Sequence, residues 1–375
     1  MALIEAVIDG RLEITKGLAE RIDSCLDCRA CTAGCPSGVK VDEIIYAAKA
    51  DFADRLGCNP MQKMVSKGML TKGQNSPLLL MIVGALKRLA YDRLPAFLPL
   101  PAKLKLKGKK RLLPEWGGVP LRRRNLKLTP EGETKGRVAF YVGCAANMWH
   151  QATGESVIEV LRRNGREVVL VDEEVCCAVP FLSRGDRGTA EELARRNIAA
   201  FASLDVEAIV TCCATCGSTL KEYPRWIGDE GAKRLAEKVM DINYYIVHFL
   251  DFREGLGRVN RSVTWHDPCH LSRGQGIKDE PREILEAIPG LKFIEMDKPC
   301  HCCGFGGEVS FNNYEMSMAI AGEKVASITE SGADEVATGC PACRLHLEDA
   351  MNHAGERRAV LHPVDYLAEA YRAGE

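Results

Sequence analysis

Residues 269–303 read CHLSRGQGIKDEPREILEAIPGLKFIEMDKPCHCC, a segment that begins with one cysteine and ends with two adjacent ones. A CPAC sequence follows, with cysteines at Cys340 and Cys343. Thiolates are the protein ligands that iron–sulfur clusters and zinc prefer. Five cysteines in this order therefore indicate a metal or redox centre.

The same five-cysteine pattern occurs earlier in the chain, 125 to 127 residues upstream. The two sets are Cys144, Cys176, Cys177, Cys213 and Cys216, then Cys269, Cys302, Cys303, Cys340 and Cys343. A drift of only two residues over five matched positions indicates an internal repeat. We therefore predict two copies of one domain, at residues 136–255 and 256–375.

The segments between the cysteines also match. In each copy a strand-like run leads into the first cysteine (RVAFYVGC, SVTWHDPC), a second precedes the adjacent pair (EVVLV, KFIEM), and a third reaches the CxxC (DVEAIVTC, GADEVATGC). Amphipathic helical runs such as ESVIEVLRRNG and EPREILEAIPG separate them and end at glycine. The order β-α-β-α-β-α favours a parallel sheet covered by helices, so we predict an α/β fold with two Rossmann-like domains.

Every repeated cysteine follows a predicted strand. Sites in parallel sheets gather at the carboxyl ends of the strands, so each copy should bring its five thiols into one crevice. Four ligands complete a tetrahedral zinc site or a cubane cluster, and five leave one in excess. Adjacent cysteines diverge and so reach different metal atoms. An open, non-cubane cluster and a cubane with a spare thiol both fit this pattern.

Glycines in CCGFGGE allow backbone N–H groups to approach a cluster sulfide, and the helix after each CxxC points its positive end there. The first copy reads CCAV, with Ala178 in place of the glycine, so close approach is less assured at that site. Cys58, Cys212 and Cys300 fall outside the repeat, and we expect them to be buried structural cysteines.

The N-terminal sequence CLDCRACTAGCP has the C-x2-C-x2-C-x3-C-P spacing of cluster-binding ferredoxins. It predicts a 4Fe-4S site in residues 1–60, with Cys25, Cys28, Cys31 and Cys35 as ligands. Only one such run is present, which leaves the fourth ligand open. We favour Cys35, and Cys58 in GCNP is the alternative.

Residues 61–135 differ from the rest in being rich in proline and, near their middle, in positive charge. The stretch from Lys103 to Lys127 carries ten Lys or Arg against one Glu. We expect short helices and then an extended connector, whose charges are solvated or face an acidic partner or membrane surface. The apolar run at 75–86 is shorter than the roughly 20 residues that cross a bilayer, so we expect a buried or interfacial helix.

Composition and charge are those of an ordinary globular protein, with 375 residues, 46% hydrophobic residues and a net charge of −1. Nothing in them indicates a nucleic-acid partner. The N-terminus has acidic residues and no signal-peptide pattern, so we expect a cytoplasmic protein. In a reducing compartment, patterned cysteines, which most of the 17 in this chain are, indicate metal ligands or redox centres rather than disulfides.

Three histidines lie close to the cysteines of the second copy. His266 and His270 flank Cys269, and His301 lies just before the adjacent pair. Hydrogen bonding to a cluster or to the backbone is the simpler role. Delivery of a proton to a reducible substrate is the more specific role, so His266 and His270 are the catalytic candidates. No G-x-G-x-x-G follows a strand, which places any flavin chemistry on a partner.

The two repeats resemble the paired-cysteine (CCG) domains of heterodisulfide reductase and its relatives. CLDCRACTAGCPSGV, HDPCHLSRGQ and VLHPVDYLAEAY resemble the iron–sulfur subunit of bacterial glycolate oxidase and related lactate-utilisation and glycerol-3-phosphate dehydrogenase subunits. The likeness is weakest in the connector. Two departures stand out, because that subunit carries two ferredoxin runs and often incomplete CxxC pairs. Here one run is present and both CxxC pairs are complete, as in the catalytic subunit of heterodisulfide reductase.

The resemblance implies that all ten repeated cysteines are metal ligands, and that the repeats hold two further iron–sulfur clusters facing each other. It implies a subunit that takes electrons from a flavoprotein oxidising a 2-hydroxy acid such as glycolate or lactate. These would pass to a quinone, another carrier or a further electron-transfer subunit, with peripheral contact at the cytoplasmic face of the membrane allowed. The alternative is a catalytic subunit that reduces a disulfide or a related sulfur compound. A zinc-bound scaffold is the third hypothesis.

Overall fold

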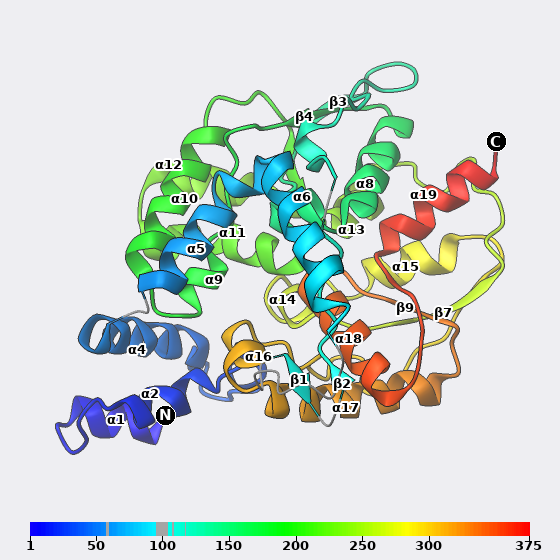
Figure 1. Cartoon of the computed structure of the whole chain (residues 1–375). Coiled ribbons are helices and arrows are strands. Elements are labelled where there is room, and N and C mark those ends of the chain that lie inside the picture. Colours follow the sequence, from blue (N-terminus) through cyan, green and yellow to red (C-terminus); the bar gives the residue numbers. More distant parts are fainter. Residues whose placement is uncertain (58–59, 95–103, 107–108, 117) are drawn as a thin grey trace.

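The computed structural model describes residues 1–57, 60–94, 104–106, 109–116 and 118–375 (Figure 1). Two α/β domains form the body of the molecule. The N-terminal helices lie together at the lower left of Figure 1, and the connecting helices run across the front of the domains. We propose to divide the chain at the limits predicted from the sequence, 1–60, 61–135, 136–255 and 256–375.

The first domain contains a four-stranded parallel sheet in the order β4-β3-β5-β6. Its strands are β3 (Gly136–Phe140), β4 (Arg166–Leu170), β5 (Ala208–Thr211) and β6 (Val239–Asp241). Its principal helices are α8 (Gln151–Arg163), α10 (Arg187–Phe201), α11 (Ala214–Ile227), α12 (Glu230–Lys238) and α13 (Ile242–Phe249). All four residues of β5 are buried, as expected for an inner strand that is covered on both faces.

The second domain repeats this topology strand for strand, in the order β8-β7-β9-β10. Its strands are β7 (Arg261–Trp265), β8 (Leu291–Phe293), β9 (Glu335–Ala337) and β10 (Val360–Leu361). Its principal helices are α15 (Glu280–Ala287), α17 (Tyr314–Ser331), α18 (Pro341–Ala354) and α19 (Pro363–Ala373). The predicted α/β class and the duplication are confirmed. The prediction of three strands per copy was incomplete, because β6 and β10 are only three and two residues long.

The two domains form a fixed pair. One hydrophobic core includes residues of both copies, among them Val138 and Leu161 of the first and Trp265 and Leu367 of the second. Helix α19 packs on α8 of the first domain, where Asn164 Nδ2 donates to the Tyr371 hydroxyl at 2.9 Å. Apolar packing and hydrogen bonds across this surface fix the two domains relative to each other, with the carboxyl edges of their sheets facing.

The N-terminal segment is a small helical unit with its own apolar centre. Its helices are α1 (Ala2–Ile8), α2 (Lys16–Asp23), α3 (Ala30–Ala33) and α4 (Val41–Leu56). Ile22 of α2 packs with Ala48 and Phe52 of α4 in that centre. The loop between α2 and α4 carries the four cysteines of the ferredoxin-like run, so the packing of these two helices positions the loop.

The connector is more structured than the sequence indicated. It contains α5 (Pro60–Leu70), a 3-10 turn η1 (Gly73–Asn75), α6 (Pro77–Leu86), a π-helical turn η2 (Lys87–Tyr91), a hairpin of β1 (Lys105–Leu106) and β2 (Lys109–Lys110), and a turn η3 (Leu121–Arg123). The expectation of a solvated charge run is wrong for Arg111 and Arg122, which are buried. Arg111 Nη1 donates to Ser310 O at 2.8 Å, and Arg122 Nη1 donates to Glu174 O at 2.8 Å, so the connector is fastened to both domains.

In the part of the chain that the structure describes, no helix combines the length and the apolar content needed to cross a membrane. Helix α6, the apolar run of the connector, has ten residues. Within this helix Leu80 is buried, whereas Leu78, Met81 and Leu86 are exposed. The helix therefore presents one apolar face to the outside.

Ala178 and Gly304 occupy equivalent left-handed positions after the adjacent cysteines of the two copies. Their φ angles are 81° and 89°. A residue with a Cβ atom is destabilised by roughly 1–2 kcal/mol in this conformation. At Gly304 an added Cβ would also lie 2.4 Å from Ser317 O, which is much closer than van der Waals contact. The first copy therefore tolerates a side chain that the second excludes.

We expect Ala178→Gly to leave the free energy of unfolding unchanged or to raise it by up to about 1 kcal/mol, because relief of the left-handed strain is partly offset by the entropy of glycine. Gly304→Ala should lower it by at least about 2 kcal/mol through the steric overlap. Anaerobic denaturant unfolding of the two variants measures both effects. Equal losses in the two variants would contradict this account of the loops.

Candidate metal centre

The strands of each sheet position the cysteines at one edge. Cys144 lies in α7 (Gly143–Met148), just after β3, and Cys213 lies two residues after the end of β5. In the strand order β4-β3-β5-β6 the order of the strands reverses between β3 and β5, and ligands bind at such a switch point in open α/β sheets. Cys269 after β7 and Cys340 after β9 repeat the arrangement. The repeated cysteines of each copy therefore lie at the carboxyl edge of its sheet.

The ten repeated thiols form a single row, in which each side chain interacts with the next. The order is Cys144, Cys176, Cys177, Cys216, Cys213, Cys340, Cys343, Cys303, Cys302 and Cys269. In the second half, Cys303 Sγ donates to Cys343 Sγ at 3.1 Å. The row has the same order from either end, and the copies meet at Cys213 and Cys340.

Backbone contacts join the copies at that meeting point. Ala214 N donates to Gly339 O at 2.9 Å, which links the two CxxC loops directly. The Thr215 hydroxyl lies 3.4 Å from Cys340 Sγ of the other copy. Two five-cysteine sites are therefore fixed face to face, each at the first turn of a helix, α11 or α18.

Backbone N–H groups donate to two of the cysteine sulfur atoms. Gly304 N donates to Cys302 Sγ at 3.4 Å, and Cys216 N donates to Cys213 Sγ at 3.4 Å. Such donors and the positive ends of helices stabilise thiolates. The donor set is thus suited to soft metal centres, and it fits iron–sulfur clusters.

Because the thiols are closely packed, some of them donate hydrogen bonds and their neighbours accept them, which shifts their pKa values in opposite directions. Hydrogen bonds from Cys269 and Cys303 lower the pKa of Cys302 to about 2. Hydrogen bonding to Cys302 raises the pKa of Cys269 and of Cys303 well above the ordinary value. A metal binds the thiolate form, so loading of the site must release the protons that the flanking thiols hold.

His266 faces the second site. One of its ring nitrogens, Cys303 Sγ and Cys343 Sγ lie within 4.8 Å of one another. Both ring nitrogens are buried without a hydrogen-bond partner among the described residues. Burial lowers the pKa of His266 to about 3, so the ring is a neutral imidazole near neutral pH. A neutral ring can donate from one nitrogen and accept at the other, which fits a contact with a metal centre.

His270 and His301 turn away from the row of thiols. His270 Nε2 lies 3.0 Å from Asp27 O and 3.1 Å from Asp27 Oδ2. His301 is exposed, with Nδ1 3.5 Å from a carboxylate oxygen of Glu323. Of the three histidines singled out from the sequence, the structure brings only His266 to the repeated cysteines, and it makes His270 a contact for the N-terminal segment.

The cysteines outside the repeat take different positions. Cys212 is fully buried in the main hydrophobic core, as expected for a structural thiol. Cys300 is partly exposed, and its thiol donates to Asp267 Oδ2 at 3.4 Å. Cys58 lies outside the described residues, so the choice between Cys35 and Cys58 as the fourth N-terminal ligand stays open. Cys35 Sγ accepts from Val39 N at 3.3 Å.

The ferredoxin-like loop docks beside the second site. Burial raises the pKa of the Cys28 thiol, and the nearby Cys302 raises it further. Arg273 joins the two segments, because Nη1 donates to Cys28 O at 2.9 Å and Nη2 donates to Cys300 O at 2.8 Å. The N-terminal site is therefore adjacent to the second copy, through Cys28 and Cys302.

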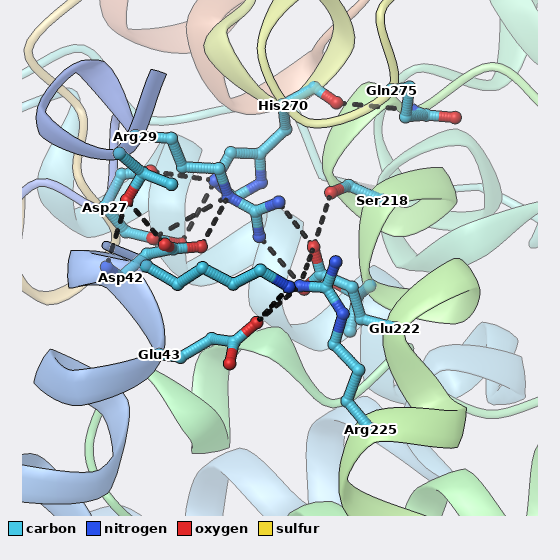
Figure 2. A network of polar contacts seen from close by, with 12 residues as sticks. Asp27, Arg29, Asp42, Glu43, Ser218, Glu222, Arg225, His270 and Gln275 are labelled. Atoms are coloured by element: carbon cyan, nitrogen blue, oxygen red, sulfur yellow. Dashed lines mark hydrogen bonds and ion pairs between the residues drawn. The ribbon is translucent and has the colours of Figure 1, made fainter. Parts of the chain in front are cut away.

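A buried charge network holds this loop in place (Figure 2). Arg29 forms a bidentate ion pair with Glu222 of α11, with Nη2 donating to Oε2 at 3.0 Å. Arg29 also lies 3.8 Å from Asp42, and Asp27 pairs with His270. Asp27 and Arg29 adopt left-handed φ angles of 52° and 59°. No sequence pattern indicates this network, because its members belong to three segments far apart in the chain.

Two α/β crevices, each lined by a CC pair, a CxxC pair and a lone cysteine, define a cysteine-rich protein of metal-binding type. A family model described as "Cysteine-rich domain", abbreviated CCG, matches the chain twice, over residues 138–221 and 263–348. The chain is also 31% identical to the "Probable glycolate oxidase iron-sulfur subunit" of Bacillus subtilis, over 99% of this chain and 87% of that protein. It therefore belongs to the family of CCG-domain iron–sulfur oxidoreductase subunits.

Two further relatives widen the family. One of the subunits of the fumarate reductase (CoM/CoB) of Methanothermobacter marburgensis is 39% identical over 58% of this chain. This chain spans 43% of that protein's length. One of the subunits of the dihydromethanophenazine:CoB--CoM heterodisulfide reductase of Methanosarcina barkeri is 26% identical over 93% of this chain and 78% of that protein. The predicted resemblance to both glycolate oxidase and heterodisulfide reductase subunits is confirmed.

We predict that Cys302→Ser removes the metal of the second site only, because Cys302 is one of the five cysteines of that site and serine is a poor ligand for soft metals. Iron and sulfide analysis with EPR on anaerobic protein measures the loss, which should be about one third of the iron if three clusters are present. Cys212→Ala is the matched control and should leave the iron content unchanged. Equal losses in both variants would contradict the assignment of Cys302.

Glu222→Gln leaves Arg29 buried with only longer contacts to Asp27 and Asp42. Breaking one partner of a buried pair is costly, so we expect about 2 kcal/mol of weaker docking and on the order of 30-fold faster amide exchange in residues 24–36. Glu43→Gln is the control, because Glu43 and its partner Arg225 are both nearly half exposed and such pairs contribute little. Unchanged exchange in Glu222→Gln would show that other contacts hold the loop.

Proposed function

We propose that this chain is the iron–sulfur electron-transfer subunit of a flavin-dependent dehydrogenase that oxidises a 2-hydroxy acid of the glycolate or lactate type. Similarity to the glycolate oxidase subunit over 99% of the chain supports this assignment. A flavin accepts two electrons from such a substrate and can release them one at a time, and one-electron transfer is the chemistry that iron–sulfur clusters supply when bound.

The chain's own residues would hold three clusters. Cys25, Cys28, Cys31 and Cys35 would bind a ferredoxin-type 4Fe-4S cluster. Each repeat would bind one further cluster, of cubane or non-cubane form, through its five cysteines. The observation that carries the proposal is the continuous placement of these residues, from Cys28 beside Cys302 along the row of ten thiols to Cys144. Because neighbouring sites are in contact, electrons would need no further carrier within the chain.

Partners follow from what the chain contains. Its sequence carries no dinucleotide fingerprint, so we assign the flavin and the hydroxy-acid site to a separate flavoprotein subunit. The exposed apolar face of α6, with Leu78, Met81 and Leu86 beside the exposed Arg88, fits a further subunit or a peripheral contact on the cytoplasmic face of the membrane. Electrons would leave to a quinone or another carrier.

One observation favours a second candidate function. Both CxxC pairs are complete, and the two five-cysteine sites meet directly at Cys213 and Cys340. A disulfide bound between two such sites could receive one electron from each side. With two electrons and two protons, its S–S bond would be replaced by two thiols. The alternative is therefore a catalytic subunit of heterodisulfide reductase type.

Electron donor and acceptor experiments separate the two functions. For the electron-transfer subunit, we expect glycolate or lactate to reduce the clusters only when the co-purified flavoprotein is present, as seen by loss of visible absorbance under anaerobic conditions. A disulfide substrate should leave the reduced clusters unchanged. Rapid reoxidation by a disulfide, with two thiols released per disulfide, and no reduction by any 2-hydroxy acid would replace the first proposal by the second.

A further inference from the structure

The repeats differ at one buried position that touches the loop before the adjacent cysteines. Lys324 of α17 and Asn197 of α10 are 127 residues apart, and both are fully buried. The Lys324 amine donates to Lys298 O at 2.6 Å and to Pro299 O at 3.1 Å. Asn197 Nδ2 donates to Cys176 O at 3.1 Å, and Oδ1 accepts from Val175 N at 3.0 Å. Both side chains fasten the same loop, one with a charged group and the other with a neutral group.

The charge of Lys324 acts on the second site. Burial lowers the pKa of Lys324 to about 8, which still leaves the amine mostly protonated at pH 7. Cys300, Cys302, Cys303 and Asp267 all contribute to keeping it protonated, so the ammonium lies within electrostatic range of two repeated cysteines. At the first site, Asn197 places no charge at this position.

One further cation increases the difference. At the second site, Arg273 donates to the carbonyl oxygen of Cys300, whereas Arg282 is offset by Asp267 at 2.9 Å and by Glu295 at 2.6 Å. At the first site the equivalent of Cys300 is Glu174, 126 residues upstream, whose oxygens accept from Val142 N and Gly143 N at 3.0 and 2.9 Å. Arg122 offsets that carboxylate. The second site therefore has an excess of positive charge that the first lacks.

We propose that Lys324 makes the cluster of the second repeat easier to reduce than that of the first, so that the second repeat takes up an electron first. The inference rests on the proposed function, in which each repeat holds an iron–sulfur cluster. In this step the cluster gains one electron from the reductant, and no bond or proton is exchanged. A nearby buried cation stabilises the extra negative charge, which raises the reduction potential.

The position of the N-terminal segment fits the proposed order of reduction, in which the second repeat is reduced before the first. Cys28 of the ferredoxin-like loop lies beside Cys302 of the second site, and the row of thiols continues from that site to the first through Cys340 and Cys213. The site that is easier to reduce is thus the one next to the N-terminal run. Lys324 is a tuning residue in this account, because it acts on the cluster through space.

EPR-monitored redox titration of the anaerobic full-length protein tests the proposal. Signals are assigned with Cys302→Ser for the second site and Cys177→Ser for the first. In the wild-type protein the second-site signal should appear at the higher ambient potential. Lys324→Gln keeps a donor but removes the charge, and at a fixed potential it should lower the reduced-to-oxidised ratio of the second site on the order of tenfold, or about 59 mV for one electron. The first site should not shift.

Two controls keep the outcome interpretable. Lys324→Arg retains the charge and should keep the second-site potential near that of the wild-type protein. Asn197→Lys should shift the first site upward. Reduction of the first site before the second in the wild-type protein, or full iron content in Lys324→Gln with no shift, would overturn the inference while the proposed function stands. Absence of iron from both repeats would instead overturn the proposed function.

Discussion

The contact between the two CxxC loops is the constraint on which the rest of the structure depends. Ala214 N donates to Gly339 O, and Cys213 meets Cys340 at the same point. This contact requires both sheets to present their carboxyl edges to one another. It also concentrates ten thiols in a largely buried row, where deprotonated sulfur is costly unless it is bound to a cation. A metal centre bound by each set of five cysteines would relieve that cost.

Duplication created two nearly equivalent sites, and other segments of the chain make them unequal. The ferredoxin-like loop docks on the second copy through Arg273, while Arg29 reaches across to Glu222 of the first. The connector adds Arg122 beneath the first site and Arg111 at the second domain. The second site therefore lies next to the N-terminal run, and the first site lies farther from it. Such an ordered series of sites is what a directional carrier of electrons needs.

Much of the fold and the positions of the cysteines could be predicted from the sequence, because they depend on patterns of residues that are close together in the chain. Strand-like runs before the cysteines predicted β3, β5, β7 and β9, and the amphipathic runs between them predicted α8 and α15. The short strands β6 and β10 lack any such pattern. The partners of Arg29 and the inward position of His266 depend on segments that meet only in the folded chain, and the burial of Arg111 and Arg122 runs against the usual behaviour of charged stretches.

Iron-edge anomalous diffraction from crystals grown and frozen without oxygen tests the central claim most directly. We expect iron density at three places, namely beside the N-terminal cysteines, in the crevice of the first repeat, and in the crevice of the second repeat. Iron at the N-terminal cysteines alone, or zinc in the two crevices, would contradict the claim that each crevice holds an iron–sulfur cluster.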